Sequence, residues 1–282
     1  MRSFGPLTAL STRRAPIHQD KPAGNYVAAV IFAGALAWWA LTSHYYDLLA
    51  LLKSLDLMLF HAINGLCGRS PIFDRIVDHL DDDQLKGVLF AGTFGACWFQ
   101  RAKSQTQRRE TLILLLLAIV ISVILARGFA HVLPFRQRPM FTADIGYRLP
   151  LFPTTSYFED WSSFPSTHAA VLFAMTAGFW LLSRGWGLMW LGFSIIAMTA
   201  RVYLGVHYPA DVIFGALIGI SITIALNSQV MRTRVAARIL SLEQVAPSIL
   251  YGLLFPFVGE VASFFGFTRG LLHAIVHLIH GV

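Results

Sequence analysis

Three short polar clusters stand at the ends of apolar segments in this sequence, and their side chains are of the types that bind and transfer phosphoryl groups. The clusters read HVLPFRQRP, FPSTH and ARVYLGVHYPAD. Together they supply imidazoles, guanidiniums, hydroxyls and a carboxylate. The candidate site residues are His131, Arg136, Arg138, Ser166, Thr167, His168, Arg201, His207 and Asp211.

The FPSTH cluster is predicted to begin a helix, with Ser166 as the N-cap after Pro165. The amides of the first helical turn have no partner within the helix and lie at the positive end of its dipole, so this end can bind an anion. Arg138 and Arg201 can each hold phosphate oxygens through a bidentate fork. Two arginines and a helix start indicate a dianionic, tetrahedral ligand.

The third cluster pairs an imidazole with a carboxylate. His207 and Asp211 are four residues apart, so their side chains share one face of a helix that begins here. The carboxylate can hold one ring nitrogen protonated and leave the other free to attack phosphorus. Pro209 fits only the first turn of such a helix, which is therefore expected to begin at about His207. His168, at the start of the other helix, can protonate a leaving oxygen.

The elements that position these clusters are predicted to be membrane helices. Of 282 residues, 56% are hydrophobic and 13% are charged, a composition too apolar for an ordinary soluble domain. The net charge of +7 resides in short Lys and Arg clusters between apolar segments, so nucleic acid is not expected as a partner. The segments predicted to cross the bilayer are Tyr26 to His44, Gly87 to Phe99, Thr111 to Val132, Ala169 to Leu182, Trp186 to Tyr203 and Val212 to Leu226.

The basic residues predict how the helices are oriented. Connections on the side of the amino-terminal tail carry twelve Lys and Arg residues, whereas the first connection on the other side, residues 45–84, has three against seven aspartates. The tail is therefore expected in the cytoplasm, with the three polar clusters at the outer face of a cytoplasmic (inner) membrane. A charged side chain at the bilayer centre costs roughly 2.5 to 3.5 kcal/mol, so the arginines must face a cavity or a ligand.

The flanking segments complete an all-α organisation. Between Lys53 and Leu80 the amphipathic stretch LKSLDLMLFHAINGL predicts a helix that lies along the membrane surface. Past residue 239 the chain stays apolar but is interrupted by prolines and glycines, and whether it crosses again is left open. The predicted parts are a basic tail (1–25), a core of about six transmembrane helices (26–228) and an apolar extension with interfacial or membrane-associated helices (229–282).

The order and spacing of the motifs resemble the type 2 phosphatidic acid phosphatase family, which shares its site with glucose-6-phosphatase and vanadium haloperoxidases. Here R-P is followed after 25 residues by P-S-T-H, and after a further 32 by R-x5-H-x3-D. The resemblance implies a six-helix membrane phosphatase that uses neither metal nor cofactor. His207 would form a phosphohistidine, Asp211 would orient it and His168 would be the general acid. The implied phosphate ligands are Arg138, Arg201, Ser166 and the backbone at Thr167.

The sequence departs from the family pattern K-x6-R-P, P-S-G-H and S-R-x5-H-x3-D at three positions. Thr167 replaces glycine, Ala200 replaces serine, and His131 stands where the family has lysine. Only the last change alters charge, because an unperturbed histidine is mostly neutral at pH 7. A nearby phosphate dianion favours the protonated imidazole, so we expect an activity optimum shifted to acid relative to a His131→Lys variant.

Other polar residues and thiols have a structural alternative. Arg136 contacts a second phosphate or the lipid headgroup, or it is an interfacial arginine with its head in water. His61 and Asn64 line the substrate entrance or serve only at the interface. Cys67 and Cys97 are expected to be unpaired, since two cysteines cannot support a disulfide framework.

Two further patterns permit metal binding, but neither is predicted to be a metal site. The acidic run Asp81 to Asp83 is interpreted as a solvated outward loop, because hard cations need a more specific arrangement of ligands. His273, His277 and His280 share a helical face, and the same pattern is typical of an amphipathic surface helix.

The sequence thus predicts a membrane lipid phosphatase that hydrolyses a lipid-linked phosphate or diphosphate, with a polyprenyl carrier favoured. Three alternatives stay open. The substrate is a glycerolipid phosphate, the phosphoryl group passes to another lipid instead of water, or the chain is a transporter or scaffold with a decayed site. The predicted partners are the lipid substrate and the bilayer.

Overall fold

The computed structural model describes residue 34 and residues 46–101, 104–151 and 161–280. The basic tail and nearly all of the first expected span, Tyr26 to His44, lie outside these residues. Every regular element in the described part is a helix, which confirms the all-α prediction.

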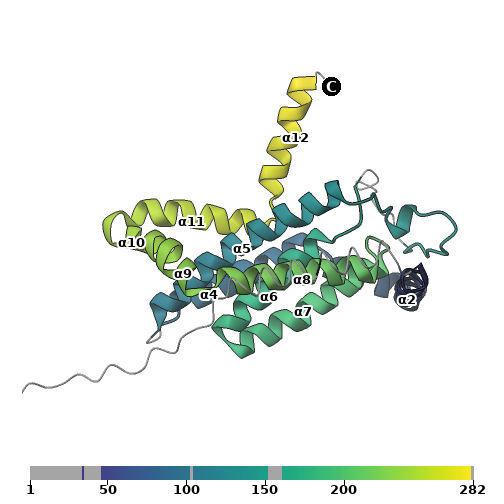
Figure 1. The fold of residues 1–282 in the computed structure, drawn as a ribbon, viewed down its shortest axis with the longest axis horizontal. Coiled ribbons are helices and arrows are strands. Elements are labelled where there is room, and N and C mark those ends of the chain that lie inside the picture. The colour runs from purple at the N-terminus through teal and green to yellow at the C-terminus, as the bar shows by residue number, and fades with distance from the viewer. Residues whose placement is uncertain (1–33, 35–45, 102–103, 152–160, 281–282) are drawn as a thin grey trace, which may run out of the picture.

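Five helices form the bundle that carries the site (Figure 1): α4 (Asp83–Phe99), α5 (Gln105–Val132), α6 (Thr167–Leu182), α7 (Arg184–Tyr203) and α8 (Pro209–Leu226). Among the described helices, α5, α7 and α8 are long and apolar enough to cross a membrane, and α6 is apolar but has only 16 residues. The helices begin in polar residues ahead of the expected apolar runs, as at Gln105 in α5. The total of six spans stays a prediction.

Close packing of α6 against α8 brings two of the polar clusters together. A Cβ added at Gly215 would lie 2.2 Å from the carbonyl oxygen of Ser166, and one at Gly219 would lie 2.1 Å from that of Ala170. Only glycine permits this approach, and small residues are typical of helix interfaces in membranes. The start of α8 is thereby held against the start of α6.

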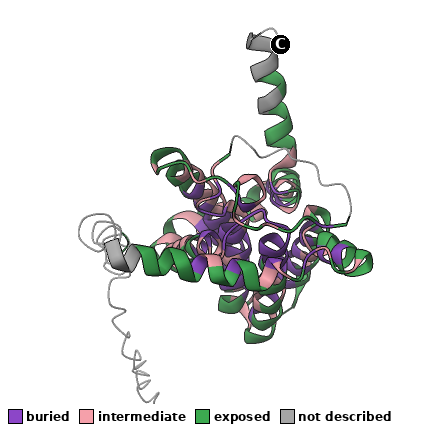
Figure 2. Cartoon of the chain, turned by 90° about the vertical axis from the view of Figure 1, so that its right-hand side faces the viewer, coloured by how far each residue is buried: buried purple, intermediate pink, exposed green. Residues whose placement is uncertain are grey.

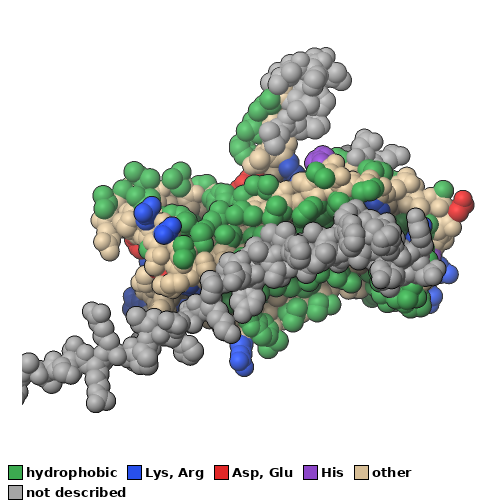
Figure 3. Space-filling model, in the orientation of Figure 1, with side chains coloured by type: hydrophobic (Ala, Val, Ile, Leu, Met, Phe, Trp, Pro, Cys, Tyr) green, Lys and Arg blue, Asp and Glu red, His purple; other side chains and the backbone are tan. Residues whose placement is uncertain are grey.

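The core of the bundle is aromatic, and its outside is apolar as well. Trp98, Phe179 and Trp190 are fully buried, and the rings of Phe179 and Trp190 stack with centroids 5.4 Å apart. Buried residues gather along the bundle axis, and exposed ones cover its rim (Figure 2). Apolar side chains are spread over the visible surface (Figure 3), and Val88 and Ile124 are among those exposed. Such a surface suits a lipid environment.

The amphipathic segment before the bundle is two helices rather than one, which corrects the sequence prediction. These are α2 (Tyr46–Asn64), seen end-on in Figure 1, and α3 (Pro71–Leu80). Gly68 lies between them at φ +71°, a conformation that favours glycine, and Ser70 caps α3 by accepting from the amide of Phe73. The turn separates two short amphipathic helices.

The C-terminal extension folds back onto the bundle. It comprises α9 (Gln229–Met231), a π-helical turn η2 (Arg232–Ala236), α10 (Ala237–Val245), α11 (Pro247–Ala262) and α12 (Gly266–His280). The expected interruption at Pro247 is the start of α11, whereas Pro256 lies inside that helix. α11 packs on α4, and α12 projects away from the bundle (Figures 1 and 2).

Candidate functional site

The three polar clusters meet at one end of the bundle, where α5 and α7 end and α6 and α8 begin. They line a small cavity of about 30 Å³. Its walls are Arg127, Ala130, Arg138, Trp161, Ser162, Pro165, Thr167, His168, Arg201, His207 and Arg269. The cavity brings together five of the nine candidates directly: Arg138, Thr167, His168, Arg201 and His207.

His207 presents one ring nitrogen for chemistry. It is 3% exposed, and its Nδ1 lies 2.9 Å from the carbonyl oxygen of Ser163 and 3.6 Å from Oδ2 of Asp211. A carbonyl only accepts hydrogen bonds, so Nδ1 carries the proton and Nε2 keeps its lone pair. Burial lowers the pKa of His207 to about 4, which keeps the ring neutral near pH 7. A neutral imidazole with a free Nε2 can act as a nucleophile.

The helix after His207 begins later than predicted. Pro209 is its first residue and Tyr208 its N-cap, so His207 lies just outside the helix rather than at its start. The amide of Tyr208 donates to Oδ2 of Asp211 over 2.8 Å. Asp211 thus holds the turn that carries His207, and the close contact of His207 is with the Ser163 carbonyl.

Arg136 does not line the cavity but forms an ion pair with Asp211. Its Nη1 lies 2.6 Å from Oδ1 of Asp211, and its Nη2 lies 2.5 Å from Oδ2 of Asp56 on α2. The other oxygen of Asp56 accepts from the amide of Ala210 in the first turn of α8. The guanidinium also lies 3.9 Å over the ring of Tyr208. Arg136 therefore has a structural role here, instead of the phosphate or headgroup contact or the interfacial position that the sequence suggested.

Two buried arginines form the cationic wall of the cavity. Arg138 is 7% exposed and donates from Nη1 to the carbonyl of Val206, and Arg201 is 5% exposed and pairs with Asp81 at 3.0 Å. Burial and the nearby Arg201 lower the pKa of Arg138 to about 10, so it is still a cation at neutral pH. The buried Nε of Arg201 has no hydrogen-bond partner among the described residues. An anionic ligand would supply one.

The start of α6 has the predicted capping. Ser166 is the N-cap, and its Oγ accepts from the amide of Ala169 over 3.3 Å. Ser166 is fully buried and its own amide donates to the backbone carbonyl of Asp211, so it joins α6 to α8 rather than lining the cavity. Thr167 and His168, the first two residues of the helix, face the cavity instead. At the helix end that the sequence predicts to bind an anion, these two residues are therefore the ones that line the cavity.

His168 is held by groups from outside the three motifs. Its Nε2 lies 3.2 Å from a carboxylate oxygen of Asp83, and its ring stacks on Phe264 with centroids 5.1 Å apart. Lys86 is fully buried between Asp81 and Asp83 at 2.9 and 3.0 Å. The interpretation of the acidic run as a solvated loop was wrong, since two of its carboxylates bind site residues. The signal was Lys86, a charged residue that directly precedes the apolar run beginning at Gly87.

His131 is not brought into the cavity. It is exposed in the last turn of α5, and the basic residue of this helix that lines the cavity is Arg127, one turn earlier. The guanidinium of Arg127 lies 4.0 Å over the ring of Trp161. The structure therefore gives no support for a shift of the activity optimum to acid pH through His131. Sequence reasoning overlooked Arg127 because it precedes the recognised motif.

Of the remaining polar residues and thiols, Asn64 has a structural role, whereas the role of His61 stays a prediction. Asn64 is buried, donates to the carbonyls of Arg148 and Tyr203, and accepts from the amide of Arg148. His61 is exposed. Cys67 and Cys97 are free and buried, as expected. The side chains of His273, His277 and His280 lie outside the described part of the structure.

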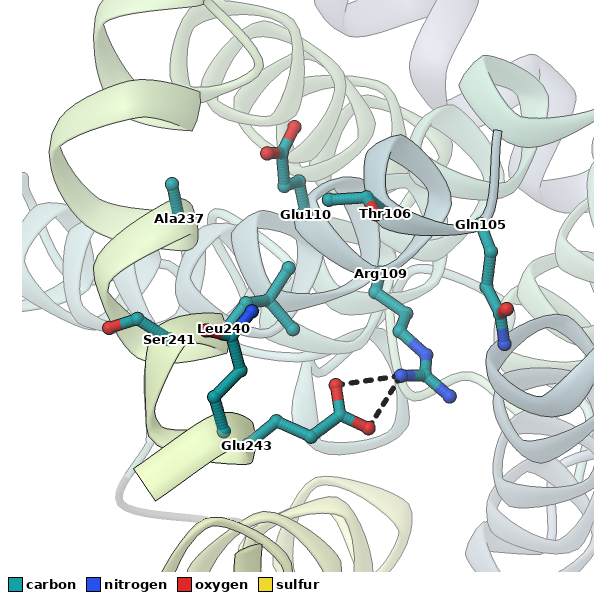
Figure 4. A pocket seen from close by; sticks show the side chains of 9 residues that line it. Gln105, Thr106, Arg109, Glu110, Ala237, Leu240, Ser241 and Glu243 are labelled. Atoms are coloured by element: carbon teal, nitrogen blue, oxygen red, sulfur yellow. Dashed lines mark hydrogen bonds and ion pairs between the residues drawn. The ribbon is translucent and has the colours of Figure 1, made fainter. Parts of the chain in front are cut away.

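A larger cavity of about 250 Å³ lies at the opposite end of the bundle, between the start of α5 and α10 (Figure 4). Its charged groups are already paired, with Arg109 Nη1 at 2.7 Å from Glu243, which also accepts from the hydroxyl of Tyr251. Of these two cavities in the described part of the chain, the smaller one is the candidate site, because imidazoles and several guanidiniums converge there.

Comparison with known proteins agrees with the geometry. The family model of the PAP2 superfamily matches residues 111–234. Escherichia coli K12 YbjG, to which undecaprenyl-diphosphatase activity is ascribed, is 28% identical over 170 residues, which are 60% of this chain and 79% of YbjG. The bacitracin transport permease protein BcrC of Bacillus licheniformis is 29% identical over a region that covers 60% of this chain and 77% of BcrC. An undecaprenyl-diphosphatase of Sulfolobus acidocaldarius is 34% identical over 39% of this chain and 51% of its own.

Two solved structures resemble this fold. Aquifex aeolicus LpxE is 28% identical with a TM-score of 0.45, covering 62% of this chain and 96% of that one. A PAP2-type phosphatidylglycerolphosphate phosphatase from Bacillus subtilis is 18% identical with a TM-score of 0.49, covering 70% and 92%. The matched family region covers most of α5, all of α6 to α8 and with them nearly all of the cavity. Residues 111–234 are thus similar to the PAP2 superfamily, and the relatives support a membrane lipid phosphatase of PAP2 type, a phosphoric ester hydrolase.

Proposed function

We propose that the protein removes the terminal phosphate from a lipid-linked phosphate or diphosphate, and that a polyprenyl diphosphate is the favoured substrate. Two relatives carry names that refer to undecaprenyl-diphosphatase activity. Cationic groups and the start of α6 surround a cavity that suits a small tetrahedral oxyanion.

The observation that carries the mechanism is the environment of His207. Its Nδ1 is engaged by the Ser163 carbonyl at 2.9 Å, and Arg138 and Arg201 line the same cavity. In the proposed reaction Nε2 attacks phosphorus in line with the leaving oxygen. The guanidiniums and the first amides of α6 stabilise the negative charge that spreads over the equatorial oxygens.

His168 is proposed to act as the general acid. Burial and the nearby Arg201 lower the pKa of His168, and the carboxylate of Asp83 opposes them, so the ring needs the negative charge of the bound phosphate to be protonated. Protonated His168 gives its proton to the leaving oxygen as the bond between phosphorus and that oxygen breaks. Neutral His168 then accepts a proton from water, whose oxygen attacks the phosphohistidine. Phosphate leaves and His207 is again neutral.

The proposed orientation places the site at the outer face of a cytoplasmic membrane, with the amino-terminal tail inside. It rests on the twelve Lys and Arg residues that the sequence assigns to the tail's side. The proposed core of 26–228 follows from the six apolar segments, and the proposed extension of 229–282 is the part of the chain after the last of them.

Phosphate release tests the proposal. The purified full-length protein is given undecaprenyl diphosphate, undecaprenyl phosphate, phosphatidate and phosphatidylglycerophosphate in turn, without any added acceptor. We expect release from the polyprenyl diphosphate above all, and none from a His207→Ala variant. Faster release from phosphatidate or phosphatidylglycerophosphate would reassign the substrate to a glycerolipid, and dependence on an added acceptor would indicate transfer instead of hydrolysis.

The intermediate is tested separately. After a brief mixing with substrate labelled at the terminal phosphate, acid-labile and alkali-stable label on the wild-type chain indicates a phosphohistidine. The label should be absent from His207→Ala. If the attack of water on the phosphohistidine needs His168, the label should accumulate in His168→Gln. Label on any residue other than His207 contradicts the mechanism.

A further inference from the structure

The cavity is lined by a fourth arginine that comes from the C-terminal extension. Arg269, in the first turns of α12, joins Arg127, Arg138 and Arg201, which belong to α5, the following connection and α7. Arg269 is exposed, so it lines the cavity at its mouth. The family match ends at residue 234, and Arg269 therefore lies outside the matched region.

The corner of residues 263–265, between α11 and α12, is fixed against the site. Phe264 and Phe265 have φ angles of 51° and 60°, which lie in the left-handed region, and the Phe265 amide donates to the carbonyl of Glu260 over 2.8 Å. Phe264 is 6% exposed and stacks on His168. The same ring lies 5.7 Å from Nζ of Lys86. The corner is thereby tied to the proposed general acid.

The end of α11 makes a second contact of this kind. A Cβ at Gly87 in α4 would lie 2.1 Å from the carbonyl oxygen of Ala262, so the two backbones touch. The carboxylate of Glu260 accepts from the amide of Thr268 over 2.8 Å and so holds the first turn of α12. Arg269 follows directly, so the contacts of Ala262 and Glu260 set its position at the mouth of the cavity.

The charges at the mouth of the cavity are not balanced within the described residues. Arg201 has Asp81 as its partner, and His168 has Asp83. Neither Arg127 nor Arg269 has a carboxylate within ion-pair distance in the described part of the chain. Two such guanidiniums in one small cavity repel each other, and a polyanion between them would relieve that repulsion.

We propose that Arg269 and Arg127 form a subsite for the second phosphate of a diphosphate substrate, so that the C-terminal extension sets the preference for diphosphates over monophosphates. The inference rests on the proposed function. The terminal phosphate occupies the inner part of the cavity, beside His207, Arg138 and Arg201. The bridging oxygen then lies toward His168, and the leaving lipid phosphate lies toward Arg269.

The chemistry of this step balances without any added reactant. The bond from Nε2 of His207 to the terminal phosphorus forms while the bond from that phosphorus to the bridging oxygen breaks. The bridging oxygen keeps the electron pair and takes a proton from His168, so the lipid monophosphate leaves as an acid anion. Arg269 and Arg127 neutralise the negative charge on the departing phosphate and thereby favour its formation.

Binding of non-hydrolysable ligands tests the subsite directly. Methylenediphosphonate and methylphosphonate are titrated into the full-length protein in detergent, and the ratio of their dissociation constants is measured by calorimetry. We expect the diphosphonate to bind about tenfold more tightly, and Arg269→Gln to abolish most of that preference, because a charge-assisted bidentate contact is lost. Arg184→Gln, an exposed arginine at the far end of α6 and α7, is the matched control and should leave the ratio unchanged.

The kinetic counterpart uses one lipid tail with two headgroups. With farnesyl diphosphate and farnesyl phosphate, Arg269→Gln should lower kcat/KM for the diphosphate about tenfold and for the monophosphate by less than about twofold. An unchanged binding ratio, or equal losses on both substrates, overturns the subsite. If the wild-type protein hydrolyses neither compound, the proposed function fails, and the binding ratio still decides whether the subsite exists.

Arg127→Gln provides a second variant. It should lower the same ratio, and its stacking on Trp161 means that folding must be checked by thermal unfolding. Arg269 is exposed and stacks on no aromatic ring among the described residues, so Arg269→Gln is the variant that decides whether the subsite exists.

Discussion

Asp211 is surrounded by more partners than a simple pair with His207 would require. One of its oxygens contacts Arg136 and the other accepts from the amide of Tyr208, while the His207 ring is 3.6 Å away. Its buried charge is therefore compensated chiefly by Arg136, which is in turn fixed by Asp56. Arg136 is a positioning residue, since it reaches the reacting imidazole only through Asp211.

Replacing Arg136 by glutamine should lower kcat and leave KM within about twofold, because the substrate does not touch it. The loss of a hydrogen bond to a charged group is worth about 1.5 to 3 kcal/mol, which corresponds to roughly 10- to 100-fold in rate. Steady-state kinetics on the preferred lipid phosphate give both constants. Arg138→Gln provides the contrast, since a cavity-lining arginine should raise KM as well. A rise in KM alone for Arg136→Gln contradicts the positioning role.

The titration of His207 gives a second prediction at this scale. Burial, the largest cause, lowers its pKa from 6.5 to about 4, so the free enzyme carries a neutral His207 at every pH above that value. Protonation removes the lone pair of Nε2, and activity is therefore lost as pH falls through about 4, not through 6.5. The acid limb of kcat/KM, corrected for protonation of the substrate, measures this group in the free enzyme. A midpoint near 6.5 would show that the imidazole is not desolvated.

The sequence was sufficient to predict that the motif residues next to helix ends would meet in one site. The spacing of Arg138, Ser166, His168, Arg201 and His207 places each at an end of a predicted helix, and alternate helix ends meet on one side of a bundle. Contacts from elsewhere were not predictable in this way. Arg127 depends on the rotation of α5 about its axis, and Phe264 depends on how the extension packs.

At the scale of elements, the site depends on how closely α8 approaches α6. The carbonyl of Ser166 and the backbone of Ala170 lie where side chains of Gly215 and Gly219 would be. The contact fixes the beginning of α8, with His207 just before it, relative to the beginning of α6, which is predicted to bind an anion. The apolar pattern alone could not predict this, since it gives helix positions along the chain but not their separation.

Gly219→Ala should therefore destabilise the protein although alanine is the better helix former. The new Cβ would lie 2.1 Å from the Ala170 carbonyl oxygen, and the helices must separate to accommodate it. Gly192→Ala in α7 is the matched control, because nothing lies within 4 Å of a Cβ there. Helix propensity favours alanine by about 0.8 to 1 kcal/mol, so this control should match or exceed the wild type in Tm. Thermal unfolding in detergent compares them, and equal Tm values for the two variants would argue against tight packing.

For the whole molecule, the bundle separates two polar ends. The candidate site lies where α5 ends, and the paired cavity of Arg109 and Glu243 lies where α5 begins. With 28 residues, α5 is about 42 Å long at 1.5 Å per residue, enough to cross a bilayer. The two ends are then expected on opposite sides of the membrane, and the proposed orientation, which rests on the basic residues of the sequence, places the site at the outer one.

Labelling of single cysteines tests this orientation. Ala143→Cys lies in the exposed connection at the site end, and Ser104→Cys precedes α5 at the other end. The native thiols should not interfere, because Cys67 and Cys97 are each 1% exposed and burial raises the pKa of Cys67 to about 11, which keeps its thiol protonated. A membrane-impermeant maleimide should label Ala143→Cys in intact cells and Ser104→Cys only after permeabilisation. The reverse pattern would place the phosphatase site in the cytoplasm, where lipid phosphates of the inner leaflet would be its substrates.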